Sequence, residues 1–255
     1  MQPRIAIPQP TADNYAYNLQ NWRVYADAVR ASGGLPFEVA LTSSRAALEE
    51  MARTMDGFLL PGSPFDVNPE SYGQTPQPEC APADPLREQT DRILIEHAHS
   101  EAKPVFAICF GMQMLNVFYG GTLVQDLTIL PVNHAAARGV HVAHSIEVDA
   151  NSLLCEISVT SGGQDPKVSV QFDVNSSHHQ AVGIVGQDLV VVARSRPDGV
   201  VEAIGGRDVR GGSVHRFVLG VQWHPERTYD SSPASRALFY RFVEAAALTQ
   251  RLIHV

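Results

Sequence analysis

The chain has 255 residues, of which 44% are hydrophobic and 18% charged, a composition typical of a soluble globular protein. The formal net charge is −8, from 19 basic and 27 acidic side chains, and no run of Lys or Arg occurs. We therefore expect neither nucleic acid nor an anionic membrane surface as a partner.

The sequence carries no signal for a membrane or for an oxidising compartment. No segment reaches the roughly 18 uninterrupted apolar residues of a membrane helix, and the N-terminal MQPRIAIPQP lacks the apolar core of a secretory signal. Cys80, Cys109 and Cys155 are odd in number and show no CxxC spacing, which argues against a disulfide framework or a thiolate zinc site. We expect a cytoplasmic protein with reduced thiols.

The first half of the chain alternates short apolar runs with amphipathic segments. Strands are predicted at 4–10, 36–41, 56–61 and 104–109. Helices are predicted within 17–36, ended by Gly33–Gly34, and at 44–55, 84–103 and 111–121. Alternating strands and helices indicate a parallel sheet that is covered on both faces.

The second half is rich in β-structure and closes with a helix at 232–253. Its predicted strands lie within 140–148, 167–177, 189–199, 200–206 and 217–225. There is no internal repeat and no clear linker, so we expect one domain over 1–255. The predicted fold class is three-layer α/β: a mostly parallel central sheet with helices on both faces, plus extra antiparallel strands.

Cys109 stands where a short apolar strand meets a predicted helix. A strand–turn–helix unit places its turn residue at the carboxyl end of a parallel sheet, where open α/β folds bind ligands. In hydrolases the same unit holds a strained nucleophile, and Gly111 allows close packing here. The amino end of the helix favours negative charge on the sulfur. The alternative is a small buried core residue, which is the interpretation we give Cys80 and Cys155.

A thiol nucleophile needs a base, and the segment GVQWHPE (220–226) supplies His224 directly after a predicted strand. Glu226 can orient the imidazole as the acid of a catalytic triad does. Pro225 fixes its own φ and stiffens this turn. The sequence alone does not show that His224 meets Cys109, because the two residues lie far apart in the chain.

Reaction at a carbonyl also needs hydrogen-bond donors for the developing oxyanion. The N–H of Phe110, directly behind the candidate nucleophile, is one such donor. The LLPGSP loop at another strand end offers the N–H groups of Gly62 and Ser63, whereas Pro64 has none.

Together these motifs resemble the class I glutamine amidotransferase superfamily, and within it the gamma-glutamyl hydrolases of peptidase family C26. A cysteine elbow followed by a WHPE element is highly specific for this resemblance, which implies a flavodoxin-like fold. The matching segments are 59–73 (LLPGSPFDVNPESYG), 84–91 (DPLREQTD), 107–127 (AICFGMQMLNVFYGGTLVQDL), 174–182 (VNSSHHQAV), 195–204 (SRPDGVVEAI) and 220–226 (GVQWHPE).

The resemblance implies a role for each matching residue. Cys109 is expected to be the nucleophile, His224 the general base and acid, and Glu226 its orienting group. Ser63 is the family's oxyanion donor, which joins the Phe110 N–H. The positions expected to contact the glutamyl group are Gln113, Ser177, His179 and Gln180.

The predicted reaction is hydrolysis of a small gamma-glutamyl-amine through a gamma-glutamyl thioester. The alternative is a glutaminase subunit that passes ammonia to a separate synthase, because Phe110 is apolar where the hydrolase branch often has arginine. A third hypothesis is a non-enzymatic module, against which the intact triad argues. The sequence does not name the amine; it leaves a homodimer open, and segment 128–145 is expected to cover the site entrance.

The remaining histidines and charges receive a structural interpretation. His134, His141, His144 and the pair His178–His179 lack carboxylate partners at ligand spacing, so we expect no metal and no cofactor. The charged run 84–92 is expected to form a solvated helix face, although Asp84 and Arg87 are candidates for fixing the neighbouring loop.

Overall fold

The computed structural model describes residues 1–162, 170–207 and 216–253, and within these ranges eleven strands form one mixed sheet. The strands on its main path, in spatial order, are β2 (Leu35–Val39), β1 (Arg4–Pro8), β3 (Gly57–Leu60), β4 (Val105–Ile108), β11 (Val218–Val221), β10 (Val201–Gly206), β9 (Leu189–Ser195), β6 (His144–Val148) and β7 (Val170–Val174). Two short strands, β5 (Leu123–Val124) and β8 (Ala181–Val182), pair beside β10.

The sheet changes direction at β10. From β2 to β11 the neighbouring strands are parallel, because helical crossovers connect β1, β2, β3 and β4. From β11 through β10, β9 and β6 to β7 every pair is antiparallel. The predicted parallel sheet with extra antiparallel strands is confirmed.

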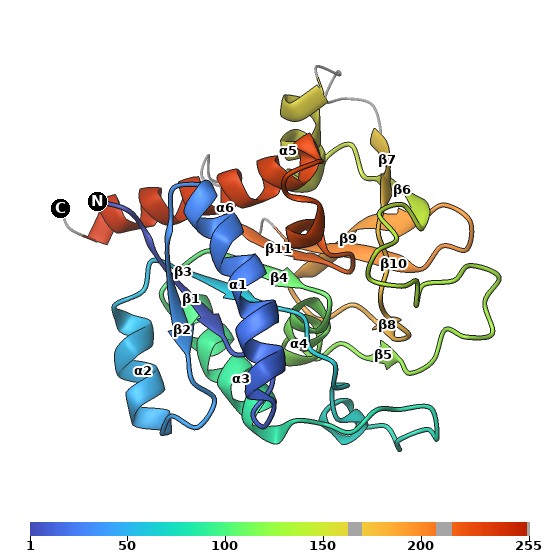
Figure 1. The fold of residues 1–255 in the computed structure, drawn as a ribbon, viewed down its shortest axis with the longest axis horizontal. Helices are drawn as coiled ribbons and strands as arrows, with labels where there is room; N and C mark the ends of the chain where they lie inside the picture. The colour runs from blue at the N-terminus through green and yellow to red at the C-terminus, as the bar shows by residue number, and fades with distance from the viewer. Residues whose placement is uncertain (163–169, 208–215, 254–255) are drawn as a thin grey trace.

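Helices cover both faces of this sheet, as Figure 1 shows. One face carries α1 (Tyr15–Ala31), α5 (Leu153–Gly162) and α6 (Pro233–Ile253), and the other carries α2 (Arg45–Arg53), α3 (Pro85–Ser100) and α4 (Phe110–Phe118). Along β4, Phe106 and Ile108 pack into the first layer while Val105 and Ala107 pack into the second. Because both faces are buried, such a strand reads as a continuous apolar run.

The structure differs from the sequence prediction in the second half. Helix α5 was not predicted. Its buried residues include Leu154, Cys155 and Ile157, and the segment has too few polar positions between its apolar residues to show a helical period. The strand expected within 140–148 begins only at His144. Residues 167–169 of another predicted strand lie outside the described residues.

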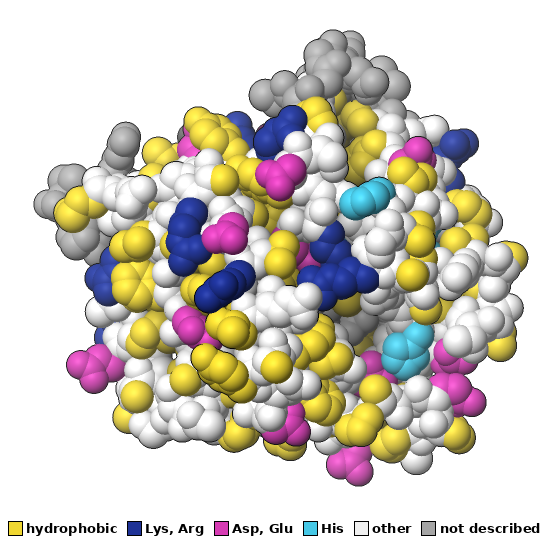
Figure 2. All heavy atoms as spheres, in the orientation of Figure 1, with side chains coloured by type: hydrophobic (Ala, Val, Ile, Leu, Met, Phe, Trp, Pro, Cys, Tyr) yellow, Lys and Arg dark blue, Asp and Glu magenta, His cyan; other side chains and the backbone are white. Residues whose placement is uncertain are grey.

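The described part of the chain contains no helix that is both long and apolar enough to span a bilayer. On the face seen in Figure 2, acidic and basic side chains are scattered among apolar and uncharged ones.

Gly111 allows α4 to lie close against β3, because it has no side chain at the point where the two elements meet. A Cβ atom at Gly111 would lie 2.7 Å from the Cβ of Leu60 and would also overlap the Leu60 carbonyl group. Gly111→Ala should therefore lower the free energy of unfolding by about 1–3 kcal/mol, the usual cost of overpacking. Urea unfolding followed by circular dichroism measures this change.

Gly139→Ala is the matched control, because a Cβ there meets no atom within 4 Å. Its effect should stay within about 0.5 kcal/mol, as for most surface substitutions. Equal stability of the two variants would contradict the close packing of α4 on β3.

Candidate active site

Cys109 lies at the end of β4 with its backbone at φ 53° and ψ −109°. This left-handed conformation is rare for a residue other than glycine and stores about 1–3 kcal/mol. The N–H of Cys109 donates to the carbonyl of Val221 in the sheet, at 2.8 Å, and its carbonyl accepts from the N–H of Gln113 in the first turn of α4, at 3.1 Å. The backbone of Cys109 thus forms one hydrogen bond with the sheet and one with the helix, and it must turn sharply between them.

Strand pairing brings His224 to this elbow. Strands β4 and β11 are parallel, with Val221 opposite Ile108, so both strands end at the same edge of the sheet. The His224 ring lies close enough to Cys109 for the two to interact electrostatically, and its Nδ1 lies 2.7 Å from Oε1 of Glu226. The structure therefore brings the three residues of the predicted triad together.

The electrostatics of His224 depend on these two neighbours. Burial lowers the pKa of His224, but the charge of Glu226 and contact with Cys109 outweigh it and raise that pKa to about 9. Burial likewise opposes ionisation of Glu226, yet His224 and then Arg227 bring the pKa of Glu226 below its usual value. An imidazolium near neutral pH favours negative charge on the adjacent sulfur.

Asn175, which follows β7, holds the backbone of His224 in place. Its side-chain oxygen accepts from the His224 N–H and its side-chain nitrogen donates to the His224 carbonyl, both at 2.8 Å. Asn175 is buried, so this pair of bonds is shielded from water. Because Pro225 begins the 3₁₀ turn η2 (Pro225–Thr228), the histidine is fixed on both sides.

The loop after β3 lies against the Cys109–His224 pair. A Cβ at Gly62 would lie 3.0 Å from Cε1 of His224 and 3.7 Å from Cβ of Cys109. The N–H of Gly62, predicted as a possible oxyanion donor, instead donates to the hydroxyl of Tyr25 at 3.1 Å. The N–H of Phe110 has no acceptor within α4, because Phe110 is the first residue of that helix.

Arg87 fixes this loop from α3, as its candidacy in the sequence suggested, whereas the expectation of a solvated helix face is wrong for this residue. Arg87 is fully buried and forms an ion pair with Asp91, also fully buried, at 2.9 Å. Its guanidinium donates to the carbonyls of Pro61, at 2.6 Å, and Pro10, at 3.2 Å. The Arg87 guanidinium lies 4.8 Å from the ring centroid of Phe110. This cation–π contact is a structural reason for an aromatic residue directly after Cys109.

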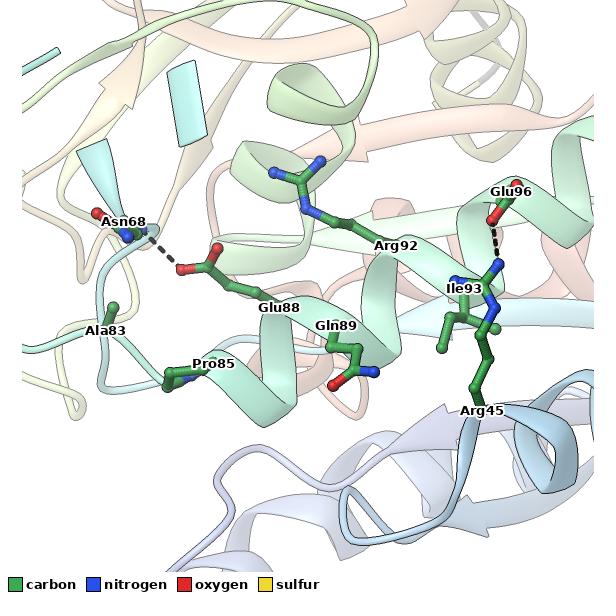
Figure 3. A pocket seen from close by; sticks show the side chains of 9 residues that line it. All are labelled: Arg45, Asn68, Ala83, Pro85, Glu88, Gln89, Arg92, Ile93 and Glu96. Carbon is green, nitrogen blue, oxygen red and sulfur yellow. Dashed lines mark hydrogen bonds and ion pairs between the residues drawn. The ribbon is translucent and has the colours of Figure 1, made fainter. Parts of the chain in front are cut away.

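A second clamp from α3 holds the far part of the loop, as Figure 3 shows. The Glu88 carboxylate accepts from the N–H of Asn68 at 2.8 Å and from the hydroxyl of Ser71 at 3.1 Å. The hollow of about 280 Å³ drawn there runs along α3, between Arg45 and Asn68, and does not include Cys109. We attribute to it no part in the chemistry at the elbow.

A pocket of about 210 Å³ opens beside Cys109 and gathers most residues predicted to touch a ligand. The predicted residues among its lining are Ser63, Cys109, Phe110, Gln113, Ser177, His179 and Gln180. Within it, Nε2 of Gln113 donates to the carbonyl of Gln180 at 3.1 Å. Ala135 also lines it, so segment 128–145 contributes to the pocket wall.

An ion pair joins two walls of this pocket. Nε2 of His179 lies 3.0 Å from the carboxylate of Asp66, and this hydrogen bond raises the pKa of His179. Three residues of the site were not predicted from the sequence: Asp66, Asn175 and Tyr25. Asp66 and Asn175 lie in matched segments, but Tyr25 lies on the core face of a helix, where an aromatic residue carries no signal of function.

The prediction that the other histidines lack a carboxylate partner is also wrong. Oε1 of Glu202, on β10, lies 3.3 Å from Nδ1 of His134 and 3.0 Å from Nε2 of His144. Nε2 of His178 lies 3.6 Å from the same oxygen. The spacing of these residues along the chain does not reveal that they meet, because antiparallel strands bring together residues that are distant in sequence.

The family relationship agrees with this site. A family model described as Peptidase C26 matches residues 8–226. The gamma-glutamyl-gamma-aminobutyrate hydrolase PuuD of Escherichia coli (strain K12) is 37% identical over 235 residues, 87% of this chain and 84% of that protein. Protein NtpR of Enterococcus hirae is 34% identical over 227 residues, which cover 86% and 87% of the two chains.

Among solved structures, a protein from Thermoplasma acidophilum that is described as part of a GMP synthase matches with a TM-score of 0.66, at 14% identity and over 100% of this chain and 99% of the other. That likeness supports the class I glutamine amidotransferase fold. The chain belongs to the peptidase C26 family and is a hydrolase of the glutamine amidotransferase type.

Proposed function

We propose that this protein, acting as a single domain, hydrolyses the gamma-glutamyl amide bond of a small gamma-glutamyl-amine. The observation that carries the proposal is the placement of His224 between Glu226, which its Nδ1 meets at 2.7 Å, and Cys109, which lines the pocket. The name of the Escherichia coli relative supports a gamma-glutamyl substrate. The pocket is smaller than the roughly 300–1,000 Å³ of drug-sized ligand sites, which favours a small substrate.

In the first half-reaction, the sulfur of Cys109 attacks the gamma-carbonyl carbon and forms a carbon–sulfur bond. The tetrahedral intermediate collapses by breaking the carbon–nitrogen bond, and the His224 imidazolium gives its proton to the departing amine. In the second half-reaction, neutral His224 takes a proton from water, whose oxygen attacks the thioester. The tetrahedral intermediate then collapses by breaking the carbon–sulfur bond, which releases glutamate and the Cys109 thiolate. His224 keeps the proton taken from water and is again an imidazolium, while the new carboxyl group loses its proton to solvent.

The N–H groups of Ser63 and Phe110 are the proposed donors to the oxyanion in both half-reactions. Gly62 is the third candidate, but Tyr25 already accepts its N–H. The Arg87 bond to the Pro61 carbonyl holds the Ser63 side of this pair in place before substrate arrives. Gln113, Ser177, His179 and Gln180 are proposed to contact the glutamyl group, since they line the pocket around Cys109.

The purified protein alone should release glutamate from at least one member of a panel of gamma-glutamyl amides. Cys109→Ala should lower kcat/KM by at least about 10³-fold, as loss of a nucleophile does, while Cys109→Ser should still bind substrate. Cys155→Ala, at a cysteine of α5 outside the pocket lining, is the matched control and should keep the wild-type rate.

Three other outcomes of this assay would contradict the proposal. Glutaminase activity that appears only with a partner synthase would identify an ammonia-donating subunit. No turnover of any gamma-glutamyl amide or of glutamine would indicate a non-enzymatic role. Unchanged turnover in Cys109→Ala would remove the proposed nucleophile.

The three thiols should differ in reactivity. Cys109 lines the pocket beside an imidazolium, whereas Cys155 is fully buried and burial raises the pKa of its thiol. Limited iodoacetamide treatment near neutral pH, read by mass spectrometry, should label Cys109 before Cys80 or Cys155. Hydrolysis should be lost in parallel with this label, and activity surviving full modification of Cys109 would contradict its role.

The pH dependence should report the His224–Glu226 contact. The alkaline limb of kcat/KM should lie near pH 9, where His224 loses the proton that the amine requires. Glu226→Gln should move this limb to lower pH, because the carboxylate charge raises the pKa of His224. Glu244→Gln, on the exposed face of α6, should leave the limb in place.

The same contact should make stability depend on pH. Because folding raises the pKa of His224 from 6.5 to about 9, its contribution is complete below about pH 6.5 and is lost as the pH rises through 9. The difference in unfolding free energy between the wild type and Glu226→Gln should therefore narrow across this window. A difference that widened with pH would contradict the assigned protonation of His224.

A further inference from the structure

His134, His144 and His178 surround one carboxylate oxygen of Glu202 inside the protein. The distances from Oε1 of Glu202 to the nearest ring nitrogens are 3.0 Å for His144, 3.3 Å for His134 and 3.6 Å for His178. All four residues are buried, with exposed fractions of 2% for His134, 7% for His144, 6% for His178 and 0% for Glu202. We call these four residues the His₃Glu cluster.

Two of these histidines already use one nitrogen in another hydrogen bond. Nε2 of His134 lies 2.9 Å from the Asp198 carboxylate, and Nδ1 of His178 lies 2.9 Å from the carbonyl oxygen of Gln180. Carboxylate and carbonyl oxygens only accept, so these nitrogens carry the protons. In a neutral imidazole the other nitrogen then carries a lone pair.

Those lone pairs face the oxygen of Glu202. Nδ1 of His134 and Nε2 of His178 have no hydrogen-bond partner, although both are deeply buried. A buried lone pair that faces a carboxylate is repelled and loses its hydrogen bond with water. The arrangement is favourable only if a positive charge lies among these atoms, supplied either by a metal ion or by two additional protons.

The geometry of the cluster suits a tetrahedral metal ion. Zinc bonds of about 2.0–2.1 Å to nitrogen and oxygen imply separations of roughly 3.3 Å between neighbouring ligand atoms. The three nitrogen–oxygen distances in the cluster lie on both sides of this value. The ligand atoms of His134, His144 and Glu202 all lie within 4.8 Å of one another, a group that does not include His178.

The surroundings also match a zinc site. Metal-bound histidines commonly donate their second ring N–H to a carboxylate or a backbone carbonyl, as His134 does to Asp198, whereas Nδ1 of His144 has no hydrogen-bond partner. One divalent cation balances the two carboxylates of Glu202 and Asp198 while all three imidazoles remain neutral. Three imidazoles with one carboxylate favour zinc over magnesium or calcium, which prefer sites made of oxygen atoms.

We propose that the His₃Glu cluster binds one zinc ion through Nδ1 of His134, Nε2 of His144 and Oε1 of Glu202, with Nε2 of His178 beside the fourth coordination position. None of these residues belongs to the Cys109–His224–Glu226 triad, so the ion has a structural role. His134 adjoins Ala135, and His178 adjoins His179, both of which line the pocket. The ion joins segment 128–145 and the SSHHQ segment to strands β6 and β10, and so fixes two walls of the pocket.

The whole chain, stripped with a chelator and then dialysed against Zn²⁺, should retain one zinc per chain by mass spectrometry. X-ray absorption at the zinc edge should show nitrogen and oxygen ligands with imidazole scattering and no sulfur. Zinc should also raise the midpoint of thermal unfolding. A sulfur ligand would place the ion at a cysteine instead, and a wild type that retained no zinc would mean that protons occupy the cluster; either result overturns the proposal.

Variants locate the ion. His144→Gln removes one ligand and should abolish retention, whereas His99→Gln, on the surface of α3, and Cys109→Ala should each retain one zinc. If His144→Gln does not fold, Asp198→Asn decides: loss of the partner of His134 should weaken zinc affinity by about 10–100-fold. Wild-type affinity in Asp198→Asn, or retention of zinc in a folded His144→Gln, would overturn the assignment.

Discussion

The backbone of Cys109 is the constraint on which the rest of the site depends. One residue must close the hydrogen bonds of a buried strand and open a helix, and it does so at φ 53°. Such strain persists only where the surroundings hold it. Here β11 binds the N–H of Cys109, the first turn of α4 binds its carbonyl, and the absence of a side chain at Gly111 lets α4 pack against Leu60.

The groups around Cys109 are held by buried polar contacts rather than by the apolar core alone. Arg87 anchors the loop after β3 through the Pro61 carbonyl, and Asn175 anchors the backbone of His224 through two hydrogen bonds. Removal of one partner from such a pair leaves the other unsatisfied away from water, which is strongly unfavourable. These contacts therefore resist small displacements of Cys109 and His224, and positioning on this scale is what the proposed acyl transfer requires.

The parallel and antiparallel halves of the sheet contribute different parts of the site. The parallel strands β4 and β11 deliver Cys109 and His224 to one edge, while β7 and the segment after it deliver Asn175 and the pocket wall. The His₃Glu cluster lies where these antiparallel strands meet the loops around the pocket. A zinc ion there would make the wall of the pocket, and not only the Cys109 elbow, part of a rigid framework.

The sequence by itself determined the layered α/β fold and the residues that form the cysteine elbow. The reason is local: a short apolar run, a turn and a helix reveal their periods within ten or so residues, and the WHPE element is a continuous motif. It could not decide which residues meet. The contact of His224 with Cys109 depends on the pairing of β4 with β11, which no local pattern specifies.

The two errors about charged and histidine residues have the same origin. Arg87 lies in a run that reads as a solvated helix face, yet the carbonyl groups of a distant loop satisfy its donors and allow full burial. His144 and Glu202 lie 58 positions apart, so ligand spacing along the chain conceals a contact of 3.0 Å. The sequence determined which chemical groups were available, and only the tertiary structure decided their partners, because burial and charge pairing depend on contacts between segments that are remote in the chain.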